Sequence, residues 1–307
     1  MQRGRVRRQQ APRVCARVKT HILLNRAGGS ADRSSAVEQA LRSAGVEGRP
    51  QWFDAHEIAD AAEAAVAEGA ELLVAGGGDG TISMIAGALA GTDVRLGILP
   101  LGTLNHFARD LRIPMRLEDA ATLIAQGRER RVDVGEVNGR VFVNNSAIGL
   151  YPLMVVDRNS QQRRLGRRKR LAMAVAAART LVKFSSRRLT LTVDERTARV
   201  DTPLLFVGNN SYRLEVPGAG TRERLEGGEL CVIALRRKSR WGFCAAAVRA
   251  LVGLDRGIDV VRLDDVQAVR VDSSRPRVTI SIDGETDRVA PPLDYRIRPK
   301  ALRVIAP

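Results

Sequence analysis

The chain has 307 residues, 44% of them hydrophobic, which is enough for one large domain or two ordinary ones. Lys and Arg total 50 against 34 acidic residues, so the formal net charge is +16 and the composition favours anionic partners. Aromatic residues reach only 4%, which argues against a base-stacking surface, and we expect no nucleic-acid partner. The three Cys residues are widely spaced, which excludes a disulfide framework and predicts a reduced, cytoplasmic chain.

The N-terminal segment, residues 1–17, is basic and has no apolar core, so we expect a tail rather than a secretory signal. The longest apolar runs further along are interrupted by Arg179 and Arg249. No uninterrupted apolar run reaches the length of about 18 residues that a spanning helix needs. The sequence therefore predicts no membrane span.

Residues 18–128 alternate between strand-like and helix-like segments. Such alternation is typical of a parallel sheet covered by helices, so we expect an α/β domain here. The expected strands are 18–24, 51–53, 71–75 and 94–99, and the expected helices are 31–44, 56–68, 82–90 and one that begins at residue 106.

The pattern changes near residue 130. Asn138-Gly139 lies between the strand-like runs VDVGEV and RVFVNN and predicts a hairpin with a tight turn. An apolar helix is expected at 171–184, and later strand-like runs read LTLTV, PLLFVG, LCVIAL and RVTISI. We expect a second, β-rich antiparallel domain over residues 129–293, with a cleft between the two domains.

The stretch GGGDGT, Gly76 to Thr81, follows a buried strand and precedes a helix. Glycines at such a junction let backbone N–H groups approach phosphate oxygens. The stretch is not a P-loop, because no Lys follows it, and its glycines do not match the spacing of the dinucleotide fingerprint. Asp79 would repel a phosphate unless Mg²⁺ or its water lies between them, or unless Asp79 binds an attacking alcohol.

GGGDGT resembles the signature loop of the diacylglycerol kinase catalytic domain family, which includes bacterial lipid kinases and sphingosine kinases. PLGTLNHFARDL (100–111) and NRAGGS (25–30) resemble two further motifs of its nucleotide-binding domain, and VNNSAIGLYP, FVGNN and IDGE lie where the family has motifs of its β domain. NAD kinases and phosphofructokinases have a related glycine loop, but PLGTLNHFA and VNNSAIGLYP argue against an NAD kinase. The resemblance covers residues 18–307.

The resemblance implies a two-domain, ATP-dependent lipid kinase whose active site lies in the cleft between an α/β nucleotide-binding domain and an antiparallel β-sandwich domain. Residues 294–307 would return to the first domain. Carried over residue by residue, the expected nucleotide contacts are Asn25, Gly28, Gly29, Ser30, Gly77, Gly78, Asp79, Gly80, Thr81, Thr103 and Asn105.

By the same resemblance, Glu285 would be the general base that takes the proton of the lipid hydroxyl. Asp283 would place Mg²⁺-bound water, and Asp79 would act on the metal's water or on the incoming hydroxyl. The expected metal contacts, both through water, are thus Asp79 and Asp283. ATP and Mg²⁺ are the expected cofactors.

Three positions depart from the family pattern. His106 stands where the family often has Asp, and Arg26 stands where it favours Pro. Gly227 replaces the second Asp of an L-D-D-G motif that accompanies a structural magnesium, and neighbouring Glu226 is a weak substitute. We assign no metal to this last position.

The expected acceptor is diacylglycerol or a related glycerolipid, which would place the chain in phospholipid biosynthesis. A sphingoid base is the alternative acceptor, and a non-catalytic nucleotide- or lipid-binding relative is the alternative to an enzyme. Residues 162–170 include six basic side chains and could hold the protein peripherally on an anionic membrane. A homodimer is also possible.

Overall fold

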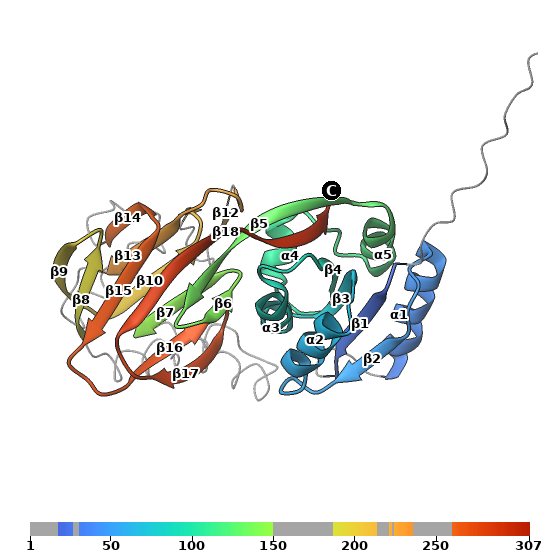
Figure 1. Ribbon diagram of the computed structural model, residues 1–307, viewed down its shortest axis with the longest axis horizontal. Coiled ribbons are helices and arrows are strands. Elements are labelled where there is room, and N and C mark those ends of the chain that lie inside the picture. Colours follow the sequence, from blue (N-terminus) through green and yellow to red (C-terminus); the bar gives the residue numbers. More distant parts are fainter. Residues whose placement is uncertain (1–17, 27–30, 150–186, 214–220, 223, 236–259) are drawn as a thin grey trace, which may run out of the picture.

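The computed structural model describes residues 18–26, 31–149, 187–213, 221–222, 224–235 and 260–307. Figure 1 shows two lobes side by side: an α/β lobe formed by the N-terminal elements and a β-rich lobe. Two long strands run from one lobe into the other, β5 (Arg128–Val137) and β18 (Leu293–Ala306). The expected combination of a parallel α/β domain with an antiparallel β domain is confirmed.

The α/β lobe is built on four parallel strands in the order β2-β1-β3-β4, with helices packed against them. The central strand β3 is buried along its whole length, which explains its continuous apolar sequence. The strands are β1 (Thr20–Asn25), β2 (Pro50–Phe53), β3 (Leu72–Gly77) and β4 (Arg95–Pro100), and the helices are α1 (Ala31–Ala44), α2 (Ile58–Ala67), α3 (Asp79–Leu89), α4 (His106–Asp110) and α5 (Leu117–Gln126).

Helix α4 is much shorter than the helices before it. It ends at Asp110, and Arg112 then adopts a left-handed φ of 59°. Pro114 follows within the same turn region and cannot continue a helix, because it lacks an N–H. A separate helix, α5, therefore begins beyond it.

The β-rich lobe is an antiparallel sandwich. One sheet has the order β14-β13-β10-β7-β16-β17, and the other is a continuation of the first lobe's sheet through β18-β15-β8-β9. The strands are β6 (Arg140–Phe142), β7 (Asn145–Gly149), β8 (Arg187–Val193), β9 (Arg196–Thr202), β10 (Leu204–Asn209), β11 (Tyr212–Arg213), β12 (Thr221–Arg222), β13 (Leu230–Leu235), β14 (Val260–Val266), β15 (Ala268–Ser273), β16 (Val278–Ile282) and β17 (Glu285–Val289).

The predicted hairpin at Asn138-Gly139 is confirmed, with φ of 47° and 83° at the two turn residues and Val137 paired to Arg140. The prediction that its second strand continues through VNN is wrong. Strand β6 stops at Phe142, and the chain joins the other sheet as β7 from Asn145. The N–H groups of Val143 and Asn144, which lie between the two strands, donate to the Asp283 side chain instead of to a neighbouring strand.

Strand β18 ties the lobes together. Its first half pairs with β15 of the sandwich, and its second half pairs in parallel with β4. Arg298 on this strand donates to buried Glu136 on β5. It also donates to the carbonyl of Ala90, the C-cap residue of α3. The C-terminal end of α3 therefore contacts β18, and its first turn, at Gly80, lies beside Glu285 of the β16–β17 hairpin. Both ends of α3 thus meet strands of the sandwich.

Candidate active site

The glycine stretch does not form one open loop. Gly76 and Gly77 complete β3, Gly78 is the N-cap, and Asp79 is already the first residue of α3, three residues earlier than the expected start at Ile82. A Cβ added to Gly77 would lie 2.5 Å from the Thr81 side chain. Glycine is needed here because strand and helix turn back on each other at contact distance.

The second motif, PLGTLN, packs directly on the first. The N–H groups of Leu101 and Gly102 both donate to the Gly77 carbonyl at 3.1 Å. A Cβ on Gly102 would fall 2.4 Å from the Cα of Gly78. The two glycine-containing segments therefore touch backbone to backbone, which a side chain at position 102 would prevent.

Asn105 shapes this second loop. It is buried in a left-handed conformation (φ 51°, ψ 48°), and its Oδ1 accepts from the Gly102 N–H at 3.1 Å. Its Nδ2 donates to the carbonyls of Pro100 and Gly102 at 3.2 and 2.8 Å. The side chain expected to touch the nucleotide thus fixes the loop, whereas Thr103 lies exposed at the loop's surface.

The first-strand motif reaches the same place through Asn25. Its Nδ2 donates to Thr81 Oγ1 at 2.8 Å, which joins the end of β1 to the first turn of α3. Neighbouring Arg26 forms an exposed 3.5 Å pair with Asp54. Gly28, Gly29 and Ser30 lie outside the described residues, as do the tail 1–17, the basic segment 162–170 and the helix expected at 171–184.

Asp79 lies between the first turns of two helices. Its Oδ1 accepts the N–H of Phe107 in α4 at 3.1 Å, where a negative charge is favoured by the helix dipole. This contact connects GGGDGT to the helix that begins at His106. The carboxylate therefore has a structural partner in addition to the metal and substrate roles expected for it.

On the sandwich side, the IDGE motif forms the turn between β16 and β17. Asp283 and Gly284 have φ of 45° and 90°, the left-handed pair of a tight hairpin turn. The Asp283 carboxylate accepts three backbone N–H groups, from Val143 at 2.7 Å, Asn144 at 2.8 Å and Asn145 at 2.9 Å. These three residues follow β6, where the chain leaves the hairpin and enters β7.

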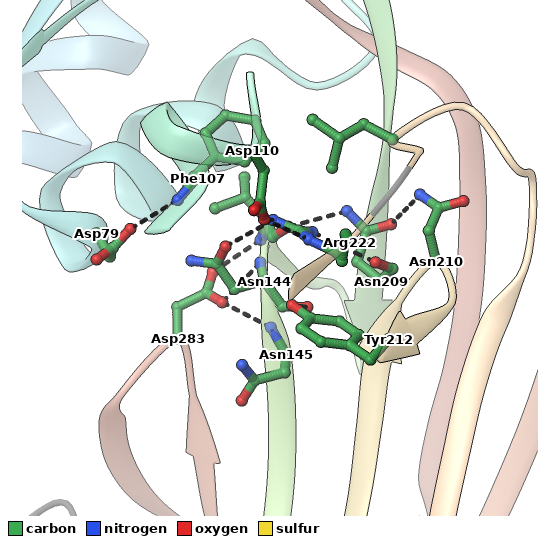
Figure 2. A network of polar contacts seen from close by, with 12 residues as sticks. Asp79, Phe107, Asp110, Asn144, Asn145, Asn209, Asn210, Tyr212, Arg222 and Asp283 are labelled. Atoms are coloured by element: carbon green, nitrogen blue, oxygen red, sulfur yellow. Dashed lines mark hydrogen bonds and ion pairs between the residues drawn. The ribbon is translucent and has the colours of Figure 1, made fainter. Parts of the chain in front are cut away.

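Burial raises the pKa of Asp283, while a hydrogen bond from the Ser83 hydroxyl and the bonds from the 143–145 amides lower it. Although the residue as a whole is only half-buried, its carboxyl group is the part turned into the protein, as Figure 2 shows. Ser83 belongs to α3, so Asp283 links the IDGE turn to the glycine-motif helix as well as to β7.

Glu285 begins β17 and is exposed. A Cβ added to Gly80 would lie 3.2 Å from Glu285 Oε1. The candidate general base is therefore beside the first turn of α3, where the nucleotide contacts are expected. The structure brings together two motifs at opposite ends of the chain.

Sequence reasoning missed a buried cation next to this junction (Figure 2). Arg222 has no exposed side-chain surface and donates through Nε and Nη2 to Asp110 Oδ2 at 2.7 and 2.6 Å. It also donates to the Val143 carbonyl at 2.6 Å and to Asn144 Oδ1 at 2.8 Å. Arg222 thus connects α4 to the segment that holds Asp283.

Aromatic rings complete the surroundings of this cation. Its guanidinium lies 5.2 Å from the ring centre of Tyr212 and 6.0 Å from that of Phe107. Burial lowers the pKa of Arg222, but Tyr212 and Asp110 outweigh burial and raise it overall. Arg222 is therefore a permanent charge, balanced by Asp110. No local sequence pattern points to this pair.

The FVGNN motif (206–210) and the segment LEGG (225–228) also have structural partners. Asn209 donates to the carbonyls of Asp133 and Val143, both at 2.9 Å. At the position where relatives carry the second Asp, the Gly227 N–H donates to Asn210 Oδ1 at 2.8 Å, and a Cβ there would lie 2.7 Å from that oxygen. Glu226 pairs with Arg130 at 2.6 Å. Within the described ranges, no cluster of three or more His, Cys, Asp or Glu residues could hold a metal.

Two family models match the chain in tandem. The diacylglycerol kinase catalytic domain matches residues 19–137, and the YegS C-terminal NAD kinase beta sandwich-like domain matches residues 154–306. The chain thus carries a diacylglycerol kinase catalytic domain followed by a YegS-type C-terminal domain. This confirms the resemblance from which the roles of Asp79, Asp283 and Glu285 were carried over.

Curated relatives agree with this assignment. A protein named "Diacylglycerol kinase" from Staphylococcus aureus is 34% identical over 141 residues, which are 43% of this chain and 44% of the relative. A Pseudomonas aeruginosa protein whose name includes "lipid kinase YegS-like" is 43% identical over 126 residues, 40% of this chain and 39% of the relative. The chain thus spans less than half the length of the curated relatives it matches.

Solved structures share the whole fold. A crystal structure of a diacylglycerol kinase from Bacillus anthracis str. Sterne superposes with a TM-score of 0.68 at 18% identity, covering 94% of this chain and 97% of that one. Another structure from the same organism reaches a TM-score of 0.73 at 20% identity, covering 94% and 98%. At these identities the likeness concerns the fold. None of the described helices is long and apolar enough to cross a membrane.

Proposed function

We propose that this chain is an ATP-dependent lipid kinase that transfers the γ-phosphoryl group to a hydroxyl of diacylglycerol or a related glycerolipid. Family membership supports a kinase, and one observation carries the proposal for this chain. The carboxylate of Glu285, from the sandwich, lies beside Gly80 in the first turn of the glycine-motif helix. Nucleotide and acceptor could therefore meet at one point.

The nucleotide side suits phosphates. The N-terminus of α3 offers backbone N–H groups next to Gly78 and Gly80, which carry no side chain to block an approaching anion. Asp79 is the carboxylate in this turn that would hold Mg²⁺ through water. Bound there, the ion would neutralise charge on the transferred phosphoryl group.

The acceptor side supplies a base. In this proposal Glu285 removes the proton of the lipid hydroxyl as the phosphorus–oxygen bond forms, a contribution of about 10²–10⁴-fold. The Asp283 carboxylate already accepts three backbone N–H groups. We therefore assign Asp283 to positioning the turn that carries Glu285, in place of the direct metal-water role expected from the resemblance.

The acceptor dissolves in a membrane, so the enzyme must reach one. The basic sequence at 162–170 supports peripheral contact with anionic lipid, at about 1 kcal/mol for each basic residue near the surface. Replacing Arg163, Arg164, Arg167 and Arg168 by Gln should weaken sedimentation with phosphatidylserine vesicles at low salt. Equal, salt-independent binding of both forms would reject this contact.

The activity is tested by incubating the full chain with γ-labelled ATP, Mg²⁺ and detergent-dispersed diacylglycerol, other glycerolipids or a sphingoid base. Label in a glycerolipid product is the expected result, and its loss on chelation would support the metal. Label only in the sphingoid base would change the acceptor class. Calorimetric ATP binding without label in any lipid would favour the non-catalytic alternative.

A further inference from the structure

A chain of hydrogen bonds leads from the glycine-motif helix to the buried cation of the sandwich (Figure 2). It begins at Asp79, whose carboxylate accepts the Phe107 N–H at 3.1 Å. Phe107 lies in the first turn of α4, and the same helix ends at Asp110. Asp110 Oδ2 accepts from Nε and Nη2 of Arg222 at 2.7 and 2.6 Å. The short helix α4 is therefore held by Asp79 near its start and by Arg222 at its end.

One peptide group carries the chain of contacts onward. Its carbonyl, on Val143, accepts from Arg222 Nη1 at 2.6 Å. Its N–H, on Asn144, donates to Asp283 Oδ1 at 2.8 Å. Because a peptide group is planar, the two ends turn together, and a cation at one edge with a carboxylate at the other fixes their direction. The position of Arg222 therefore determines how this peptide group meets Asp283.

The contacts close on themselves at the proposed base. Asp283 lies in the β16–β17 turn, and Glu285 begins the strand that follows it. Glu285 Oε1 lies 3.2 Å from the place of a Cβ on Gly80, which is the residue after Asp79, where the contacts began. Any displacement of Arg222 would thus move the Glu285 carboxylate relative to the first turn of α3.

The bonds of Arg222 do more than balance its charge. Asp110 alone supplies a negative partner for the guanidinium. Two further acceptors, the Val143 carbonyl and Asn144 Oδ1 at 2.8 Å, are neutral and lie on the segment that binds Asp283. A planar guanidinium presents its donors in a fixed fork, which a Lys ammonium cannot reproduce. The arrangement therefore fixes directions as well as charge.

We propose that Arg222 is a positioning residue for phosphoryl transfer, holding Glu285 against the nucleotide turn through the 143–144 peptide group and Asp283. Arg222 has no exposed side-chain surface, so it acts through these partners and touches neither substrate. The inference rests on the proposed function and adds a residue to its machinery. A misplacement of about 1 Å caused far from the chemistry can lower a rate by about 10²-fold.

The first measurement uses Arg222→Lys, which keeps the positive charge and removes the fork. The full chain is assayed at saturating γ-labelled ATP and dispersed diacylglycerol. We expect kcat to fall by about 10–100-fold, since the base is misplaced. Calorimetric ATP affinity should change by less than about threefold, because the backbone N–H groups that meet the phosphates belong to the glycine segment itself.

The second measurement repeats the substitution in a Glu285→Gln background. If Arg222 acts by placing Glu285, Arg222→Lys should lower kcat there by less than about threefold, because residues that act as a unit are not additive. A merely structural role predicts the same factor in both backgrounds. Equal factors would therefore overturn the inference while the kinase activity stands.

A matched control separates positioning from stability. Thr202 is buried and donates to the carbonyls of Leu204 and Leu235 at 2.6 and 2.8 Å. It precedes β10, whose opposite end, at Asn209, is the end that meets Arg222. Thr202→Val should lower the melting temperature and leave kcat unchanged. A fall in kcat like that of Arg222→Lys would assign the loss to stability and overturn the inference.

A milder variant serves if Arg222→Lys does not fold. Asn144→Ala removes only the bond from Arg222 Nη2 and keeps the backbone N–H that binds Asp283. It should lower kcat by about threefold or more, and again only when Glu285 is present. Wild-type kcat in Asn144→Ala or in folded Arg222→Lys would overturn the inference. No labelled lipid from the wild type would overturn the proposed function with it.

Discussion

At the β3–α3 junction the groups that meet the expected nucleotide come from one short segment, Gly76 to Thr81, and most of them are backbone atoms. The β16–β17 turn is held differently. Its Asp283 depends on amides at 143–145 and on Ser83, and those amides belong to a segment bound by Arg222. Local geometry builds one half of the site, and long-range side-chain contacts build the other.

The difference predicts where the molecule is sensitive. Substitutions in the glycine segment should disturb only the residues that the new side chain would clash with. Substitutions around Asp283 should act at a distance, because each partner there is shared with another element. The following changes in unfolding free energy, measured by urea denaturation, separate the two behaviours.

The largest effect is expected at the Arg222–Asp110 pair. Arg222→Met leaves the Asp110 carboxylate largely buried without its cation and should cost about 3–5 kcal/mol. The double variant Arg222→Met/Asp110→Leu should cost less than the sum of the two single changes, because neither charge is then stranded.

An exposed ion pair provides the control. Glu38 and Arg42 lie one turn apart on α1 with side chains 41% and 81% exposed. Glu38→Gln should change stability by no more than about 0.5 kcal/mol. A similar small change at Arg222 would show that the buried network does not hold the sandwich half of the site.

An intermediate effect is expected for Gly102→Ala, whose new Cβ would fall 2.4 Å from the Gly78 Cα. Backbone must shift, at about 1–3 kcal/mol for overpacking of this kind. In Gly78→Ala the new Cβ meets Gly102 Cα at 3.4 Å, so folding should suffer less while calorimetric ATP affinity falls. Unchanged ATP affinity in a folded Gly78→Ala protein would contradict the nucleotide assignment.

Among the substitutions at the site, the smallest effect is expected for Thr81→Val. The change keeps the shape of the side chain and removes the oxygen that accepts from Asn25 at 2.8 Å. A single hydrogen bond of this kind is worth about 1 kcal/mol. Stability loss of several kcal/mol would mean that the β1–α3 contact is as interdependent as the Asp283 network.

The same contrast explains what the sequence could predict. The strands and helices of the first lobe follow from apolar periodicity, and the tight turn at Asp283-Gly284 follows from its residue types. The sequence does not predict that α3 begins as early as Asp79, because consecutive glycines are typical of loops. The close packing of Gly76 on Leu24 and of Gly77 on Thr81 is visible only in the structure. Arg222 and Asp110 could not be paired from sequence, since no periodicity relates positions so far apart.

Asn105 shows a related limit. Its motif marks it as a site residue, but only coordinates reveal that its amide closes the loop through Pro100 and Gly102. Likewise, the sequence associates Asp283 with Glu285, whereas in the structure the Asp283 carboxylate accepts three backbone N–H groups and Glu285 lies exposed beside Gly80.

The central claim is that Glu285 serves an acceptor hydroxyl at the nucleotide site. Its most direct test is Glu285→Gln, which keeps the shape and removes the basicity, assayed for label transfer from ATP to lipid alongside calorimetric ATP binding. The account predicts near wild-type ATP affinity and a kcat lower by about 10²–10⁴-fold. Wild-type turnover in Glu285→Gln would contradict it.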